Sequence, residues 1–281
     1  MSRLLHAGYY RLRKNKLTWA CLILTISYCL FIYVTQYHNI RQYGGAVSLD
    51  PLFFNFVIYM GILTAVLTSL FIGTEYHDGT IRNKIVCGLS RNSIYLSNLL
   101  LCVFTGTILL LVSFLIGLLV GIPLFGTFTM TTPTLLSLCM ISLLSTWAYI
   151  SIFTMVTTLS PSRTTAAILN LLLAFGLLFI GMIILNKLCQ PEYIQQVVAT
   201  PDTDAIITGE AELEWVKNPF YLTGMKREIY QHLLDFLPSG QVMQIFNESA
   251  TNILRMILYS FSIIIGTNVV GLLLFHKKNI K

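Results

Sequence analysis

The sequence predicts an all-α protein that crosses a membrane six times. Hydrophobic residues make up 55% of the 281 residues, and only 11% are charged, which is less than half of the roughly 25% that soluble domains carry. The apolar residues form six runs without charge in their interiors, each near the about 20 residues that a helix needs to cross the hydrocarbon core. These runs do not alternate as barrel strands would, so helix is the state that satisfies their backbone groups in lipid.

The first element is a basic segment, residues 1–16, that precedes the first span. On a helix, Leu4, Gly8 and Leu12 would share one side, while Arg11 and Lys14 would share the opposite side. We expect this elbow helix to lie in the inner membrane interface or to act as a basic anchor that sets the topology. The six spans that follow in residues 17–281 are predicted at about 17–35, 51–72, 95–120, 134–159, 166–185 and 253–275.

The distribution of Lys and Arg predicts the orientation. With the N-terminus inside, the inner segments hold 12 basic residues and the outer segments hold 6, which places both termini in the cytoplasm. The outer region 186–252 is acidic, with nine acids against three basic residues between positions 188 and 250. The net charge of +6 therefore belongs to the inner rim, where it suits anionic membrane lipids and does not indicate nucleic-acid binding.

The inner connection between the second and third spans, residues 73–94, is rich in charge and glycine. Asp78 or Thr80 can cap a helix there, and Ile81, Ile85 and Leu89 follow at spacings of four residues. This pattern predicts a short amphipathic helix at the membrane face. Its apolar edge would rest either on lipid or in a cytoplasmic partner that grips and moves it.

The string "GTIRNKIVCGLSRNSIYLSNLL", preceded by Glu75, resembles permease subunits of bacterial ATP-binding-cassette exporters. The similar group moves peptide antibiotics, lantibiotics and amphipathic toxin peptides, and exporters of phenol-soluble modulins are the nearest likeness within it. The resemblance covers most of the chain, including the elbow, the six spans, the outer segment "NPFYLTGMKREIYQHLLDFLPSGQ" and the basic tail "FHKKNIK". The order of these parts carries it, more than any single motif.

The resemblance implies two cytoplasmic ATPase subunits and a second permease copy, with a homodimer favoured over a paralogue. Residues 75 to about 89 would form the coupling helix, and residues 160–164 a second, smaller contact. The side chains that the resemblance places at the ATPase are Glu75, Asp78, Thr80, Ile81, Arg82, Lys84, Ile85, Leu89 and Arg163, while Arg91 would anchor the return into the membrane.

The chain itself carries no ATP-binding motif of the form G-x-x-x-x-G-K-[ST]. We therefore expect no enzyme activity, catalytic residue, metal or bound cofactor in this chain, and we expect ATP and Mg to bind in the partner subunit. The string "LPSGQ" at 237–241 differs at two of five positions from the LSGGQ motif of such ATPases, and we interpret it as a coincidence.

The interiors of the spans lack ionisable residues, which argues against an ion-coupled transporter and favours amphipathic or lipophilic cargo. The predicted function is export of amphipathic peptides or hydrophobic antimicrobial compounds through a bacterial plasma membrane. An ion-driven secondary transporter or channel and a non-transporting peptide-sensing or immunity protein are the alternatives. Phe53, Asn55, Phe56 and Asn170 are candidates for the substrate route, although packing and interhelical hydrogen bonding are commoner roles for such residues.

The segment "MKREIYQHLLDFL" of the outer region predicts one more helix. Met225, Ile229, Leu233 and Phe236 recur at helical spacing, and Pro238 should end the helix. It would lie on the outer leaflet or pack over the bundle as a cap, and the cap is the arrangement that we favour.

Overall fold

The computed structural model describes residues 2–45, 47–197 and 213–278. Six of its helices are long and apolar enough to cross a membrane, which confirms the predicted spans. They are α2 (Lys16–Tyr43), α3 (Leu49–His77), α5 (Arg91–Ile116), α7 (Thr132–Leu159), α8 (Arg163–Leu188) and α12 (Ile253–Lys277). The helix α5 continues through a π-helical turn, η1 (Gly117–Gly121), into α6 (Ile122–Phe125).

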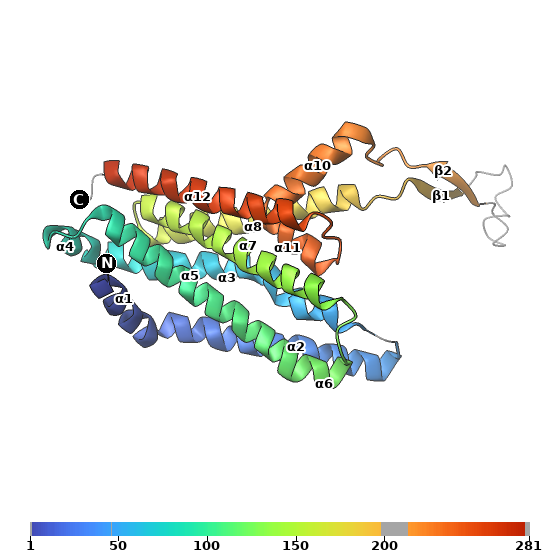
Figure 1. Ribbon diagram of the computed structural model, residues 1–281, viewed down its shortest axis with the longest axis horizontal. Helices are drawn as coiled ribbons and strands as arrows, with labels where there is room; N and C mark the ends of the chain where they lie inside the picture. The colour runs from blue at the N-terminus through green and yellow to red at the C-terminus, as the bar shows by residue number, and fades with distance from the viewer. Residues whose placement is uncertain (1, 46, 198–212, 279–281) are drawn as a thin grey trace.

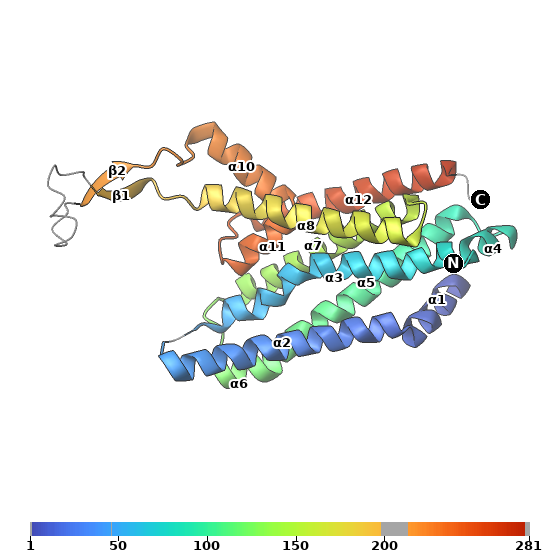
Figure 2. The ribbon, with the colours of Figure 1, turned by 180° about the vertical axis from the view of Figure 1, so that it is seen from behind.

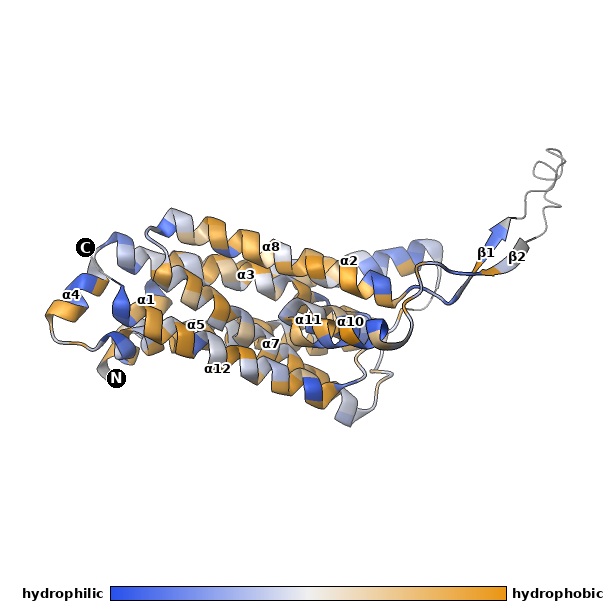
Figure 3. Cartoon of the chain, turned by 90° about the horizontal axis from the view of Figure 1, so that it is seen from above, coloured by the Kyte–Doolittle hydropathy of each residue, from blue (hydrophilic) through white to orange (hydrophobic). Residues whose placement is uncertain are grey.

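The six long helices run side by side as one bundle, with α3 near its middle (Figures 1 and 2). Two thirds of the most apolar stretch of α3 is buried (67%), against 22% for α2 and 17% for α12. The helix contacts α2, α5, α7 and α8. In Figure 3 the apolar colours follow the long helices, and the polar colours gather at their ends.

One end of the bundle, here named the α4 end, carries α1 (Ser2–Lys14), the short helix α4 (Thr80–Val86) and the end of α12 (Figure 1). The chain turns sharply between α1 and α2 because Asn15 Oδ1 accepts a hydrogen bond from the Leu17 amide at 2.9 Å, which caps α2. The turn from α3 into α4 needs Gly79, whose φ of 66° lies in the left-handed region that favours glycine.

The predicted inner connection, residues 73–94, is shorter in the structure. The helix α3 runs on to His77 and α5 begins at Arg91, because the acid Glu75 near the end of α3 is neutralised by neighbours and does not break the helix. Ser90 then caps α5 by accepting a hydrogen bond from the Ser93 amide.

The opposite end, the hairpin end, carries β1 (Tyr193–Val197), β2 (Leu213–Lys217), α10 (Gly224–Phe236) and α11 (Pro238–Phe246). The two strands are antiparallel, with Tyr193 opposite Lys217, and they project beyond the bundle (Figure 1). This hairpin was not predicted from the sequence. Residues 198–212 between the strands lie outside the described residues.

Pro238 separates α10 from α11, as predicted, because proline ends one helix and suits the first turn of the next. The helix α10 contacts α8, α11 and α12, but through Leu234 and not through the expected apolar stripe. That stripe faces outward, with Met225 77% exposed and Ile229 50% exposed. It is α11 that packs against α3, α7 and α8, where Gln241 and Ile245 are fully buried.

Candidate functional site

A buried acid at the α4 end of α3 brings four helices together. The Glu75 side chain is 3% exposed. Its Oε1 accepts hydrogen bonds from Arg11 of α1 and from Lys84 of α4, and its Oε2 accepts one from Asn98 Nδ2 of α5 at 2.8 Å. We name these four residues the Glu75 cluster. The cluster therefore joins α1, α3, α4 and α5 at one carboxylate.

The charges explain why an acid is tolerated here. Burying a carboxylate is costly unless cations and hydrogen bonds compensate for the lost water, and Arg11 and Lys84 supply both. The Arg11 guanidinium also lies over the Phe71 ring, 3.9 Å from its centroid, which adds a cation–π contact. In addition, Thr80 Oγ1 donates to the Glu75 carbonyl at 3.0 Å, which fixes the start of α4.

The helix α4 has an inner and an outer face. Ile81 is 2% exposed and packs against Tyr95 and Phe275. Arg82 and its neighbours face outward instead. The outer α4 face consists of Arg82, Asn83 and Val86, which fall within an arc of about 100° on a helix, and Val86 is 79% exposed.

This arrangement corrects three expectations. Glu75 and Ile81 were expected to contact a partner, but the structure buries both. Arg11 was expected on the polar side of the elbow helix, but it turns inward to Glu75. The spacing of residues within one helix cannot reveal these contacts, because the groups that bury them come from other helices.

The outer α4 face includes Val86, which the apolar series Ile81, Ile85 and Leu89 does not contain. The available signal was its position four residues after Arg82, which places both side chains on one helix face. Of the other expected contacts, Asp78 and Arg163 are exposed, Thr80, Ile85 and Leu89 are partly buried, and Lys84 is held by Glu75.

Arg91 holds the end of α12 and does not merely anchor α5 in the membrane. Its Nη1 donates to the carbonyls of Phe275, His276 and Lys278 at 3.0, 2.9 and 2.6 Å. The Lys278 amine in turn donates to the carbonyls of Thr158 and Ser160 at 2.8 and 2.7 Å, and burial lowers the pKa of Lys278. The start of α5, the end of α7 and the end of α12 are therefore tied together.

The second connection at this end, between α7 and α8, lies against α3. A Cβ added to Gly73 would approach the Arg163 Cα to 3.2 Å, so the first turn of α8 packs closely on the last turns of α3. Glycine permits this approach because it has no side chain. The exposed Arg163 thus sits beside the helix that carries Glu75.

The four candidates for a substrate route lie in packing between helices of this chain. Phe53 stacks on Phe114, with ring centroids 4.8 Å apart. The Asn170 amide donates to Ser69 Oγ at 2.8 Å and to Thr157 Oγ1 at 2.7 Å. The remaining two are Asn55, which accepts a hydrogen bond from Tyr28, and Phe56, which is buried and borders an apolar groove of about 390 Å³ between α2 and α3.

The described parts of the chain contain no group of three or more His, Cys, Asp or Glu side chains placed to hold a metal ion. The site at the α4 end is instead a junction of ion pairs and helix ends. Its geometry suits the transmission of movement between helices.

Comparison with known proteins identifies the family. A family model described as "ABC-2 family transporter protein" matches residues 4–177, more than half of the chain. The match begins in α1 and ends within α8, so it includes the Glu75 cluster and α4. No curated protein matches the chain. Membership implies a multi-pass membrane permease that works with a separate ATP-binding-cassette ATPase. The chain belongs to the ABC-2 family of transporter proteins.

Proposed function

We propose that this chain is the membrane-spanning half of an ATP-driven bacterial exporter and that α4 is its coupling helix. In this proposal the α4 end, with both termini, faces the cytoplasm, and the hairpin end faces outward. The positive-inside distribution of Lys and Arg supports this orientation. The amphipathic α1 would then lie in the inner interface of the membrane as the elbow helix.

The outer α4 face is the observation that carries the proposal. Arg82, Asn83 and Val86 project from a short helix whose opposite side is fixed to the bundle by Ile81. An exposed valine beside an exposed arginine offers a partner both apolar area and charge. Asp78 and Arg163 are two further exposed charges at the α4 end, after the last residue of α3 and at the first residue of α8.

The Glu75 cluster supports the transmission step of the proposal. A partner that pushes on α4 acts on Lys84, and through Glu75 it acts on Arg11 and Asn98. Closure of two ATPase subunits would thus move α1, α3 and α5 together and open a route between two permease copies. ATP and Mg would bind in those subunits.

We further propose a homodimer of this chain and a cargo of amphipathic peptides or hydrophobic antimicrobial compounds. Support comes from the spans, in which charged residues lie only near the helix ends. A route lined without ionisable groups suits such cargo, whereas ion-coupled transport depends on ionisable groups within the membrane.

The deciding experiment is purification of the tagged chain from its own cells in mild detergent, followed by measurement of ATP hydrolysis. The test variant is Arg82→Glu, which reverses a charge on the outer α4 face. We expect it to lose the co-purifying ATPase subunit and the hydrolysis, while its melting temperature stays unchanged because Arg82 is exposed.

The matched control is Lys226→Glu, the same charge reversal at an exposed position of α10. It should keep both the partner and the activity. Purification of the parent chain without any ATPase, or equal retention of the ATPase by both variants, contradicts the role proposed for α4.

A further inference from the structure

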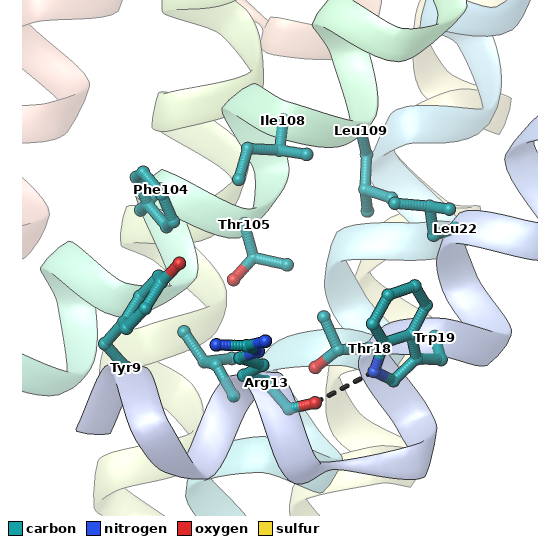
Figure 4. A pocket seen from close by; sticks show the side chains of 10 residues that line it. Tyr9, Arg13, Thr18, Trp19, Leu22, Phe104, Thr105, Ile108 and Leu109 are labelled. Atoms are coloured by element: carbon teal, nitrogen blue, oxygen red, sulfur yellow. Dashed lines mark hydrogen bonds between the residues drawn. The ribbon is translucent and has the colours of Figure 1, made fainter. Parts of the chain in front are cut away.

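An apolar groove opens on the side of the bundle where α1, α2 and α5 meet (Figure 4). Its volume is about 280 Å³, near the lower end of the range for small-molecule sites. Its apolar lining includes the aliphatic side chains of Leu12, Leu22, Ile108 and Leu109. The groove adjoins two spans, α2 and α5, so membrane lipid is the solvent on its open side.

One residue that lines this groove is positively charged. Arg13 lines the groove and is exposed, and within the described residues it forms no ion pair. The neighbouring Lys14 and Lys16 are exposed as well. Residues 1–16 contain no Asp or Glu, so the positive charge at this rim is not neutralised by its own segment.

Polar and aromatic groups surround Arg13. Figure 4 shows Tyr9 and Trp19 on either side of Arg13 and Thr18, with Ile108 and Leu109 opposite. The Thr18 hydroxyl is shielded from water and has no hydrogen-bond partner within the described residues. Tyr9 and Trp19 are 49% and 54% exposed, as is typical of aromatic residues at a membrane interface.

The corner that shapes the groove is held rigidly. Trp19 Nε1 donates to the Arg13 carbonyl at 2.8 Å, and Tyr9 packs edge-on against Phe104 with centroids 5.9 Å apart. A Cβ added to Gly8 would lie 2.2 Å from Leu101 Cδ1, so α1 sits as close to α5 as glycine permits. The groove is therefore a formed feature of the helix packing.

We propose that this groove binds one anionic phospholipid of the inner leaflet. One acyl chain lies along Leu12, Leu22 and Ile108, and the headgroup phosphate accepts hydrogen bonds from the exposed Arg13 guanidinium. The complementary charge selects an anionic lipid over a zwitterionic one. The bound lipid would brace the corner between α1 and α2. The proposal does not depend on what the chain transports.

Quenching of Trp19 fluorescence by brominated lipid tests the proposal directly. The chain has three tryptophans, and the variant Trp147→Phe, Trp215→Phe leaves Trp19 alone. This protein is reconstituted in phosphatidylcholine vesicles with increasing brominated phosphatidylglycerol or brominated phosphatidylcholine. We expect saturable quenching by the phosphatidylglycerol at about fivefold lower mole fraction, the preference that one basic residue near an anionic surface supplies.

Two further variants test whether Arg13 causes the preference for phosphatidylglycerol over phosphatidylcholine. Arg13→Gln should abolish most of it, whereas Lys277→Gln, which removes an exposed charge at the end of α12, should keep it. Equal quenching by the two lipids in the Trp19-only protein overturns the proposal, because the groove is then ordinary lipid-facing surface. Absence of quenching by either lipid also overturns it, because a second copy of the chain then covers the groove.

Discussion

Each end of the bundle buries one acid that is paired with arginine, but the two acids connect different sets of helices. At the hairpin end, Asp235 is fully buried and accepts from Arg255 Nε at 2.6 Å, from Gln244 at 2.8 Å and from Gln231 at 3.0 Å. We name these four residues the Asp235 cluster. The partners of Asp235 lie within 20 residues of it in the sequence, whereas Arg11 lies 64 residues from Glu75.

Because the sequence separations differ, the two clusters connect different parts of the chain. The Asp235 cluster fixes α10, α11 and the start of α12, which follow one another in the chain. The Glu75 cluster fixes α3, α4 and α5, which also follow one another, and adds α1, whose Arg11 lies 64 residues away in the sequence. The first is a local brace, and the second is a junction whose loss is expected to loosen the whole α4 end.

The largest expected effect is that of Glu75→Gln. Without the carboxylate, the cations Arg11 and Lys84 are left together with side chains 35% and 25% exposed, so we expect the free energy of unfolding to fall by about 3 kcal/mol, the lower end of the range for a broken buried pair. Thermal unfolding in detergent, followed by circular dichroism, measures this loss. Retention of the ATPase in the same preparation should fall as well.

Asp78→Asn is the control for Glu75→Gln. It removes an acid from the same connection, but Asp78 is exposed and contacts only His77 among the ion pairs, so the change should stay within about 0.5 kcal/mol. If both variants melt alike, the Glu75 cluster does not hold the α4 end together.

A smaller effect is expected for Asp235→Asn. The asparagine carbonyl still accepts from the two glutamines, and only the charge opposite Arg255 is lost, so we expect a loss of about 1.5–3 kcal/mol. The same melting experiment measures it, with Glu228→Gln on the exposed side of α10 as its control. ATPase retention at low temperature should be normal, and a loss of the ATPase here would erase the distinction between the two ends.

The smallest effect is expected for Lys84→Gln. This variant tests whether both cations are needed to stabilise the buried Glu75 carboxylate. Arg11 and Asn98 still bind the carboxylate, so we expect a loss of only about 1 kcal/mol in the melting experiment. Arg82→Gln, two residues earlier on the exposed face, should leave the melting temperature unchanged. A loss as large as that of Glu75→Gln means that Arg11 alone cannot neutralise the acid.

The spans were predictable from the sequence because hydropathy acts over a single helix. Apolar runs of helical length identify α2, α3 and α12 without any knowledge of their neighbours. The end of α10 before Pro238 was equally local, since proline ends a helix by its own geometry. The hairpin β1–β2 had no such signal, because its strand residues lie in an acidic loop between two helices.

The candidate site was predictable only in outline. The charge and glycine of residues 73–94 correctly pointed to a short helix, but the side chains that contact the bundle were misassigned. Ile81 and Val86 are both β-branched apolar residues of one helix, and only Tyr95 and Phe275 decide which of them is buried. The burial of Glu75 was not predictable for the same reason, because its partners Arg11 and Asn98 lie 64 and 23 residues away in the sequence.

The helix α3 carries one buried acid near each of its ends, Asp50 and Glu75. Asp50 in its first turn is fully buried and accepts from the Thr129 amide at 3.0 Å, and Glu75 lies 25 residues later, which is about seven turns. The two carboxylates therefore project from nearly the same side of one continuous rod about 43 Å long. A rotation of α3 at Glu75 would therefore also move Asp50 and the loop around Thr129, at the opposite end of the helix.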